Sequence, residues 1–226
     1  GDESKIKLYY FPFHGRAESI RMLLHHKGVE FTDHIITLED WMKGDIQKEL
    51  VMGKLPKLEI NGKTLYQSMS ILRYLGKLYG YYPTDIDAQF EVDSLIDYLS
   101  DFKEGILPYV NAQTNKAKNE ALRTFIGPHT KKYLAYFNNA VIKNGNNGFL
   151  VGDSWTVADF HVLTFVHTHL THEFYVEMYG DVIDEFAELK KYRDDRCAEL
   201  KEYLAARPNF PITYVVMKKL EFLPEE

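Results

Sequence analysis

The sequence predicts a small α/β domain followed by an all-helical domain. Strand and helix patterns alternate over the first 80 residues. A turn-rich segment, Gly80 to Asp85, interrupts the alternation, and strand patterns nearly vanish after it. We therefore expect one domain at residues 1–80 and a second at residues 81–226.

The first strand and helix follow from hydrophobic spacing. Ile6, Leu8 and Tyr10 alternate with other residues, as in a strand with one buried face. Residues 16–27 carry apolar side chains at helical spacing, and Gly28 is a typical C-terminal stop. The sequence thus predicts a strand-to-helix junction just after Tyr10.

The rest of the first domain reads as strand, short helix, hairpin and helix. Residues 31–36 form the predicted second strand, and residues 38–52 contain a short helix. Asn61-Gly62 favours a type I′ turn between strands at 57–60 and 63–66. Ser68 is the expected N-cap of a helix that runs to about Tyr79. The predicted order is β-α-β-α-β-β-α.

The second domain shows amphipathic helix patterns at residues 86–115, 117–143, 156–170 and 182–205. Thr156 and Asp159 have the spacing of a capping box, with Asp in place of the usual Glu. We interpret this pair as a structural cap without a catalytic role.

Composition excludes several classes of protein. The net charge is −6, and no basic cluster predicts nucleic-acid binding. No apolar run approaches the 18 residues of a membrane span. Cys197 is the single cysteine, which excludes an internal disulfide and fits a reducing compartment. The first five residues lack the pattern of a secretory signal, so we expect a cytoplasmic protein.

The junction after the first strand is the most informative stretch for function. It places the phenol of Tyr10 beside the guanidinium of Arg16, where a helix begins. Free N–H groups and the positive end of a helix dipole suit an anion, and a thiolate is one such anion. A phenol can donate a hydrogen bond to a thiolate and lower the thiol pKa. The alternative is that Tyr10 is a packed strand aromatic, as we expect for Tyr9.

Two further segments are candidates for ligand contacts. Pro56 stands at the start of the third strand, and a cis Leu55-Pro56 bond leaves the Leu55 backbone open to an extended peptide. An ordinary trans bond is favoured by the sequence pattern alone. Gln67-Ser68 opens the next helix and can form a carboxylate pocket, but a plain N-cap serine is the simpler reading.

Other polar groups suggest a metal only weakly. His161, His167, His169 and His172 show no third ligand or supporting shell, and we expect no metal. Asp93, Asp97 and Asp101 line one helix face, with Asp93 interpreted as solvated. The first helix begins without a cysteine, which argues against thiol–disulfide exchange.

Taken together, the motifs resemble those of cytosolic glutathione transferases, closest to the sigma class among sigma, pi and mu. The resemblance covers nearly the whole chain. Its motifs are Tyr-Phe-Pro-x-x-Gly-Arg at 10–16, Trp41, Gly-Lys-Leu-Pro at 53–56, Leu-Tyr-Gln-Ser at 65–68, Ile-Leu-Arg-Tyr-Leu at 71–75, Val-Asp-x-x-x-Asp-x-x-x-Asp at 92–101, and Val-Gly-Asp…Ala-Asp from 151 to 159.

This resemblance implies a thioredoxin-like domain before the helical one, and a cis bond at Leu55-Pro56. It implies that Tyr10 contacts the glutathione sulfur and that Arg16 supports its polarisation. The other implied contacts to glutathione are Gln67 and Ser68 for the γ-glutamyl group, the Leu55 backbone for the cysteinyl unit, and Trp41 and Lys54 near the glycyl end. Asp101 matches an acid that reaches the neighbouring subunit's ligand, which implies a homodimer.

The chain departs from the family pattern at three positions. Gln47 stands where many relatives have a lysine for the glycine carboxylate, and the adjacent Lys48 is a possible replacement. Met52 replaces the aromatic residue that plugs the partner subunit, and we expect this adaptable side chain to preserve the dimer. His14 replaces a common arginine, a change that the sequence does not explain.

The second-substrate pocket is expected across the domain junction, a usual place for ligand sites. Its expected walls are Phe11, Phe13, Ile106 and Tyr109, for which core packing is the even alternative. The implied function is conjugation of the glutathione thiolate to hydrophobic electrophiles, with glutathione as cosubstrate and no other cofactor. Two alternatives remain: a glutathione-dependent isomerase like prostaglandin D synthase, and a non-enzymatic ligand-binding relative.

Overall fold

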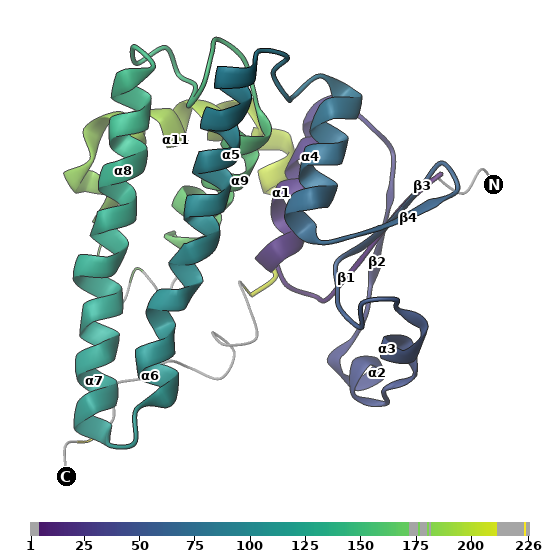
Figure 1. Ribbon diagram of the computed structural model, residues 1–226, viewed down its shortest axis with the longest axis horizontal. Coiled ribbons are helices and arrows are strands. Elements are labelled where there is room, and N and C mark those ends of the chain that lie inside the picture. Colours follow the sequence, from purple (N-terminus) through teal and green to yellow (C-terminus); the bar gives the residue numbers. More distant parts are fainter. Residues whose placement is uncertain (1–4, 172–175, 177–179, 181, 212–223, 225–226) are drawn as a thin grey trace.

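The computed structural model describes residues 5–171, 176, 180, 182–211 and 224. Within them, a small mixed sheet with its helices packs against a larger helical domain (Figure 1). No helix in these ranges is both long and apolar enough to cross a membrane. The elements of the first part are β1 (Ile6–Tyr10), η1 (Gly15–Ala17), α1 (Glu18–Lys27), β2 (Thr32–Ile35), α2 (Leu38–Met42), α3 (Asp45–Glu49), β3 (Lys57–Ile60), β4 (Lys63–Tyr66) and α4 (Ser68–Tyr79).

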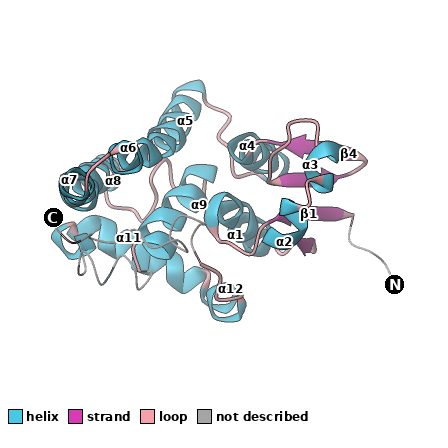
Figure 2. Ribbon diagram, turned by 90° about the horizontal axis from the view of Figure 1, so that it is seen from below, coloured by secondary structure: helices cyan, strands magenta, loops and turns pink. Residues whose placement is uncertain are grey.

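The sheet has the strand order β2-β1-β3-β4. β1 runs parallel to β2 and antiparallel to β3, and β3 pairs antiparallel with β4. The predicted hairpin is confirmed, since Asn61 and Gly62 both have positive φ (50° and 74°), as a type I′ turn requires. α1 and α4 lie on the face of the sheet that looks toward the helical domain (Figure 2).

α1 forms because its apolar side chains have a face to cover. Ile20, Leu23 and Leu24 are fully buried, and the helix ends at Gly28 in the left-handed conformation, as predicted. α1 thus begins directly after η1, which follows the loop at the end of β1.

The helical domain starts with α5 (Ile86–Asp101), and its helices are more broken than predicted. The expected helix at 86–115 is divided into α5, a 3-10 turn η2 (Phe102–Ile106) and α6 (Leu107–Asn111). The expected helix at 117–143 contains a π-helical turn, η3 (Phe125–His129), that accommodates Pro128. The remaining elements are α7 (Asn115–Thr124), α8 (Thr130–Lys143), α9 (Val157–Leu163), the π-helical η4 (Thr164–His169), η5 (Val182–Glu185), α11 (Ala187–Glu199) and α12 (Lys201–Ala206).

The capping box is present at the start of α9. The Asp159 carboxylate accepts from the Thr156 backbone N–H and hydroxyl, both at 2.8 Å, and from Leu150 N–H at 3.1 Å. The Tyr192 hydroxyl on α11 donates to the same carboxylate at 3.1 Å. Asp159 is fully buried, so this cap holds three segments of the helical domain together.

The two parts meet where α1 and α4 pack against α9 (Figure 2). The two parts approach closely at Gly76 on α4, where an added Cβ would lie 2.3 Å from Val157 Cγ1. Gly76 does not have a positive φ, so its backbone conformation does not require glycine. The requirement for glycine comes from the lack of space for a Cβ.

Candidate functional site

Tyr10 ends β1 with its ring buried and its hydroxyl at the start of the helical turn η1. The backbone N–H of Arg16 donates to the Tyr10 hydroxyl oxygen at 3.1 Å. Burial raises the pKa of Tyr10 above its ordinary value, and the Arg16 N–H and the charges of Arg16 and Arg21 offset this only in part. The phenol is therefore protonated at neutral pH, and its oxygen already has one donor. Its own proton is available to another acceptor.

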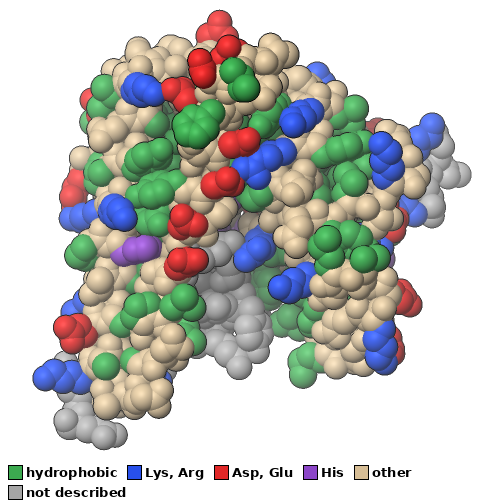
Figure 3. Space-filling model, viewed as in Figure 1, with side chains coloured by type: hydrophobic (Ala, Val, Ile, Leu, Met, Phe, Trp, Pro, Cys, Tyr) green, Lys and Arg blue, Asp and Glu red, His purple; other side chains and the backbone are tan. Residues whose placement is uncertain are grey.

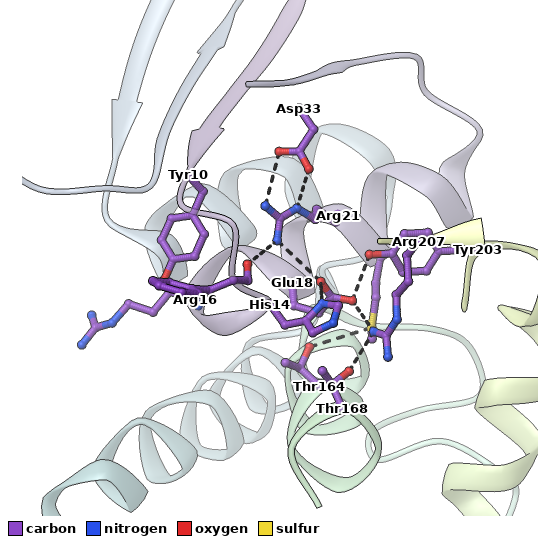
Figure 4. Close-up of polar contacts among 12 residues, drawn as sticks. Tyr10, His14, Arg16, Glu18, Arg21, Asp33, Thr164, Thr168, Tyr203 and Arg207 are labelled. Atoms are coloured by element: carbon purple, nitrogen blue, oxygen red, sulfur yellow. Dashed lines mark hydrogen bonds and ion pairs between the residues drawn. The ribbon is translucent and has the colours of Figure 1, made fainter. Parts of the chain in front are cut away.

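Arg16 takes part through its backbone. Its guanidinium is exposed and extends away from the Tyr10 ring, as Figure 4 shows. The charge still lowers the Tyr10 pKa at a distance, but the direct contact to the hydroxyl is the amide. The expected support of Tyr10 by Arg16 stays a prediction, now with the amide as the group in contact.

Arg21 is a neighbour of Tyr10 that sequence reasoning missed. Its guanidinium carbon lies 5.8 Å from the centroid of the Tyr10 ring. It donates to the Phe13 carbonyl at 2.8 Å and to the Asp33 carboxylate at 2.8 Å. The sequence did contain a signal for Arg21: it is a charged residue between the apolar Ile20 and Met22, on a helix expected to be buried. A buried arginine requires polar partners, so its neighbours were worth seeking.

The segments expected to hold a peptide ligand lie just before β3 and just after β4, at the same end of the sheet as the end of β1. The Leu55-Pro56 bond is cis, as the family resemblance implied, and it comes just before β3. Gln67 has a φ of 70° and ψ of 108°, and Ser68 is the first, buried residue of α4. The prediction that Ser68 is the N-cap is wrong: Gln67 holds that position and makes no side-chain cap bond. Gln67 instead donates to the Met52 sulfur at 3.5 Å.

The residues expected near a glycyl carboxylate lie on or after α2 and α3. Trp41 packs edge-to-face on Phe11, with ring centroids 5.0 Å apart. Gln47 is half-buried on α3, and Lys54 is exposed. Lys48 is exposed and pairs with Asp45 at 2.9 Å. Whether Lys48 or Lys54 contacts a ligand stays a prediction. Of the two, Lys54 is nearer in the sequence to the cis bond.

The acidic row on α5 divides into two parts. Asp93 and Asp97 both pair with Arg73, at 2.6 Å and 2.7 Å, and Tyr82 also donates to Asp93 at 2.7 Å. The interpretation of Asp93 as merely solvated is therefore wrong, because α4 places Arg73 beside it. Asp101 is exposed at the end of α5. Figure 3 shows acidic side chains following α5 across this face.

The four expected walls of a second-substrate pocket lie in two groups. Phe11 and Phe13 lie on the loop after β1, with ring centroids 5.8 Å apart, and Phe13 is buried in the core. Ile106 and Tyr109 pack against Leu122 and Ile126 in the helical domain. Phe11 and Ile106 also pack against the main core, and the second-substrate pocket stays a prediction.

A metal centre gains no support from the described residues, which contain no cluster of three or more His, Cys, Asp or Glu placed to hold an ion. Burial lowers the pKa of His167 to about 4. His172 lies outside the described residues.

Comparison with known proteins matches two family models to this chain. Residues 4–77 match the N-terminal domain of glutathione S-transferases, and residues 100–207 match their C-terminal domain. Among curated proteins, probable glutathione S-transferase 7 of Caenorhabditis elegans is 31% identical over 211 residues, which covers 91% of this chain and 98% of the relative.

Two solved structures are similar over nearly the whole chain. Prostaglandin synthase D of Nilaparvata lugens has a TM-score of 0.76 and 28% identity, covering 90% of this chain and 98% of that one. The monomeric glutathione S-transferase Na-GST-3 of the hookworm Necator americanus has a TM-score of 0.76 and 28% identity, covering 93% and 99%.

Proposed function

Because the chain belongs to the glutathione S-transferase family, we propose that it conjugates the thiolate of reduced glutathione to hydrophobic electrophiles, with Tyr10 stabilising the thiolate. The observation that carries the role of Tyr10 is its hydroxyl at the β1–η1 junction, protonated and already hydrogen-bonded to the Arg16 N–H. Its free proton can be donated to a sulfur anion.

The free energy needed to ionise the glutathione thiol at neutral pH is close to that of one charge-assisted hydrogen bond. A free cysteine thiol has a pKa of about 8.5, so only a few per cent is ionised at neutral pH. Lowering the pKa by two units requires about 2.7 kcal/mol of preferential interaction with the anion. A charge-assisted hydrogen bond supplies roughly 1.5–3 kcal/mol. Tyr10 therefore suffices for most of the shift, and binding beside the electrophile supplies proximity.

Glutathione is proposed to lie along the segment from the cis bond to α4. The Leu55 backbone would pair with its cysteinyl unit, and Gln67 with Ser68 would hold the γ-glutamyl end at the N-terminus of α4. Trp41, Lys54 and either Gln47 or Lys48 would contact the glycyl end. These assignments come from the family resemblance, and the place of Gln67 and Ser68 at the start of α4 supports the γ-glutamyl contact.

The test is steady-state turnover of glutathione with an aryl halide, together with ultraviolet titration of the bound thiol. We expect Tyr10→Phe to retain glutathione affinity, to raise the thiol pKa by about two units and to lower turnover at pH 7 about 25-fold, because the ionised fraction of the thiol falls from about three quarters to about 3%. Tyr9→Phe is the matched control, because the Tyr9 hydroxyl donates to Glu59 at 2.9 Å, away from the junction. An unchanged thiol pKa in Tyr10→Phe would exclude the role, and no turnover with normal glutathione binding would favour a ligand-binding protein.

A second candidate reaction is supported by the similarity to prostaglandin synthase D. In a glutathione-dependent isomerisation the thiolate attacks the substrate and is later expelled, so glutathione is regenerated. Product analysis with a prostaglandin endoperoxide separates the two reactions. A rearranged product without net consumption of glutathione would identify the isomerase.

We also propose that the protein acts as a homodimer. Asp101 is exposed at the end of α5, where it could reach a neighbouring subunit's ligand. Val51, Met52 and Phe90 are exposed apolar side chains that a second copy would cover. Sedimentation velocity tests this, because Met52→Asp should shift a dimer toward monomer while the equally apolar, exposed Met42→Asp should not. A monomeric unaltered protein, as the hookworm relative is described, would exclude the proposal.

A further inference from the structure

A buried carboxylate joins the start of α1 to α12 and the residue that follows it. Glu18 is fully buried, and its oxygens accept from His14 Nδ1 at 2.9 Å and from the Tyr203 hydroxyl at 2.9 Å. The Arg207 guanidinium forms an ion pair with the same carboxylate, and Arg21 lies 3.6 Å away (Figure 4). Four partners from the loop before η1, from α1, from α12 and from the residue after it thus meet at one carboxylate.

Arg207 is the member that reaches this carboxylate from the C-terminal end of α12. Its guanidinium also donates to the Thr168 hydroxyl at 3.0 Å, so it touches both α1 and η4. Its side chain is only 14% exposed. Without Arg207, the Glu18 carboxylate retains Arg21, at 3.6 Å, as its remaining arginine partner, so part of the charge compensation that holds Glu18 in place depends on Arg207.

The segment that follows Arg207 clamps the loop between Tyr10 and Arg16. The His14 backbone N–H donates to the Pro211 carbonyl at 3.0 Å, and the Phe210 ring lies 5.9 Å from the His14 ring. Arg21, which holds the Phe13 carbonyl, lies 5.7 Å from the Phe210 ring. The loop is therefore fixed at its backbone and at the His14 side chain.

The same loop leads directly into the Tyr10 contact. His14 is two residues before Arg16, whose N–H donates to the Tyr10 hydroxyl. A shift of His14 would move this amide and release the hydroxyl from its defined orientation. A hydrogen bond to a sulfur anion requires that orientation, because its strength falls steeply with misalignment.

We infer that Arg207, acting through Glu18 and His14, is a positioning residue that fixes the loop presenting the Tyr10 hydroxyl. The catalytic part of this inference rests on the proposed function, whereas the structural coupling does not. The inference also assigns a role to His14, because its imidazole Nδ1 contacts Glu18 from the loop.

The experiment compares Arg207→Gln with Arg207→Lys. A cavity of about 920 Å³, lined in part by Arg207 and Phe210, opens beside the cluster, so the shorter side chains meet no steric obstacle. We expect Arg207→Gln to raise the thiol pKa of bound glutathione by about 0.5–1 unit and to lower turnover about three- to tenfold when it is measured at a pH below the thiol pKa. The KM for glutathione should change less than about threefold, because the contacts that would bind the peptide part of glutathione are unaltered and only the ionised fraction of its thiol falls. Arg207→Lys, which retains the charge, should restore most of the loss.

Hydrogen exchange tests the coupling without glutathione. We expect the amides of His14 and Arg16 to exchange about tenfold faster in Arg207→Gln, as local opening becomes easier. The control is Lys131→Gln, which breaks an exposed ion pair to Glu185 and should change neither readout. If Arg207→Gln fails to fold, the double variant Glu18→Gln with Arg207→Gln leaves no uncompensated charge and should show the same changes.

Unchanged exchange at both amides would overturn the inference, as would a normal thiol pKa in a folded variant whose only change is a lower melting temperature. Failure of the proposed function looks different, because the unaltered protein would then show no thiolate titration, while the exchange experiment would still report whether Arg207 holds the loop.

Discussion

The backbone N–H of Arg16 donates to the hydroxyl oxygen of Tyr10 at 3.1 Å, while the Arg16 guanidinium extends into solvent (Figure 4). The short-range partner of the phenol is thus an amide that any residue but proline would supply. The charge of Arg16 acts only at longer range and through solvent, where screening weakens it.

This relationship predicts a mild effect for Arg16→Ala. We expect the pKa of bound glutathione to rise by less than about 0.5 unit and turnover to fall by less than about threefold, since the amide remains. The measurement is the same thiolate titration, with Tyr10→Phe as the reference for a severe loss. A change in Arg16→Ala as large as that in Tyr10→Phe would mean that the guanidinium contacts the sulfur or the ligand directly.

The Glu18 cluster predicts a pH dependence of stability. Burial alone raises the pKa of Glu18, but His14, Arg207 and Arg21 more than offset this and lower it from 4.5 to about 2. A lowered carboxyl pKa contributes stability that is present above about pH 4.5 and is lost as the pH falls toward 2. The contribution is of order 3 kcal/mol.

Urea unfolding between pH 6 and pH 3 measures this contribution. We expect the free energy of unfolding to fall less steeply with decreasing pH in Glu18→Gln than in the unaltered protein. Glu185→Gln serves as control, because that carboxylate pairs with Lys131 at the surface. Parallel curves for Glu18→Gln and the unaltered protein would mean that Glu18 is not the ionised centre of the cluster.

The contact between α4 and α9 predicts that Gly76→Ala is destabilising. An added Cβ would lie 2.3 Å from Val157 Cγ1, and Val157 is fully buried, so the helices must separate. We expect a loss of about 1–3 kcal/mol in the free energy of unfolding, as for other overpacked cores. Ser70→Ala, at an exposed position on the same helix, should stay within about 0.5 kcal/mol. A stability change in Gly76→Ala equal to that control would contradict the close approach.

Cys197 should be unreactive in the native protein. It is half-buried on α11, and burial raises its pKa to about 11, so almost no thiolate exists at neutral pH. We expect iodoacetamide at pH 7 to leave the folded protein unlabelled and to label it fully in denaturant. Rapid labelling under native conditions would show that the thiol opens to solvent more readily than its packing implies.

Short-range patterns predicted much of the fold correctly. The hairpin at Asn61-Gly62, the end of α1 at Gly28 and the cap at Thr156 and Asp159 each depend on residues within a few positions of one another. Local backbone preferences decide such features, so a sequence displays them directly. The breaks inside the helices at 86–115 and 117–143 were missed, because apolar spacing continues through them.

The sequence by itself determined the two-part architecture and singled out Tyr10 at the strand-to-helix junction. Only the tertiary structure decided which groups surround Tyr10 and how they are held. Glu18 meets Arg207 across 189 positions, and Arg73 meets Asp93 across 20. Such pairs form because separate elements bury charge at a shared interface, and no local pattern encodes which charge will face which. For that reason the amide of Arg16, the guanidinium of Arg21 and the anchoring of His14 emerged only from the folded chain.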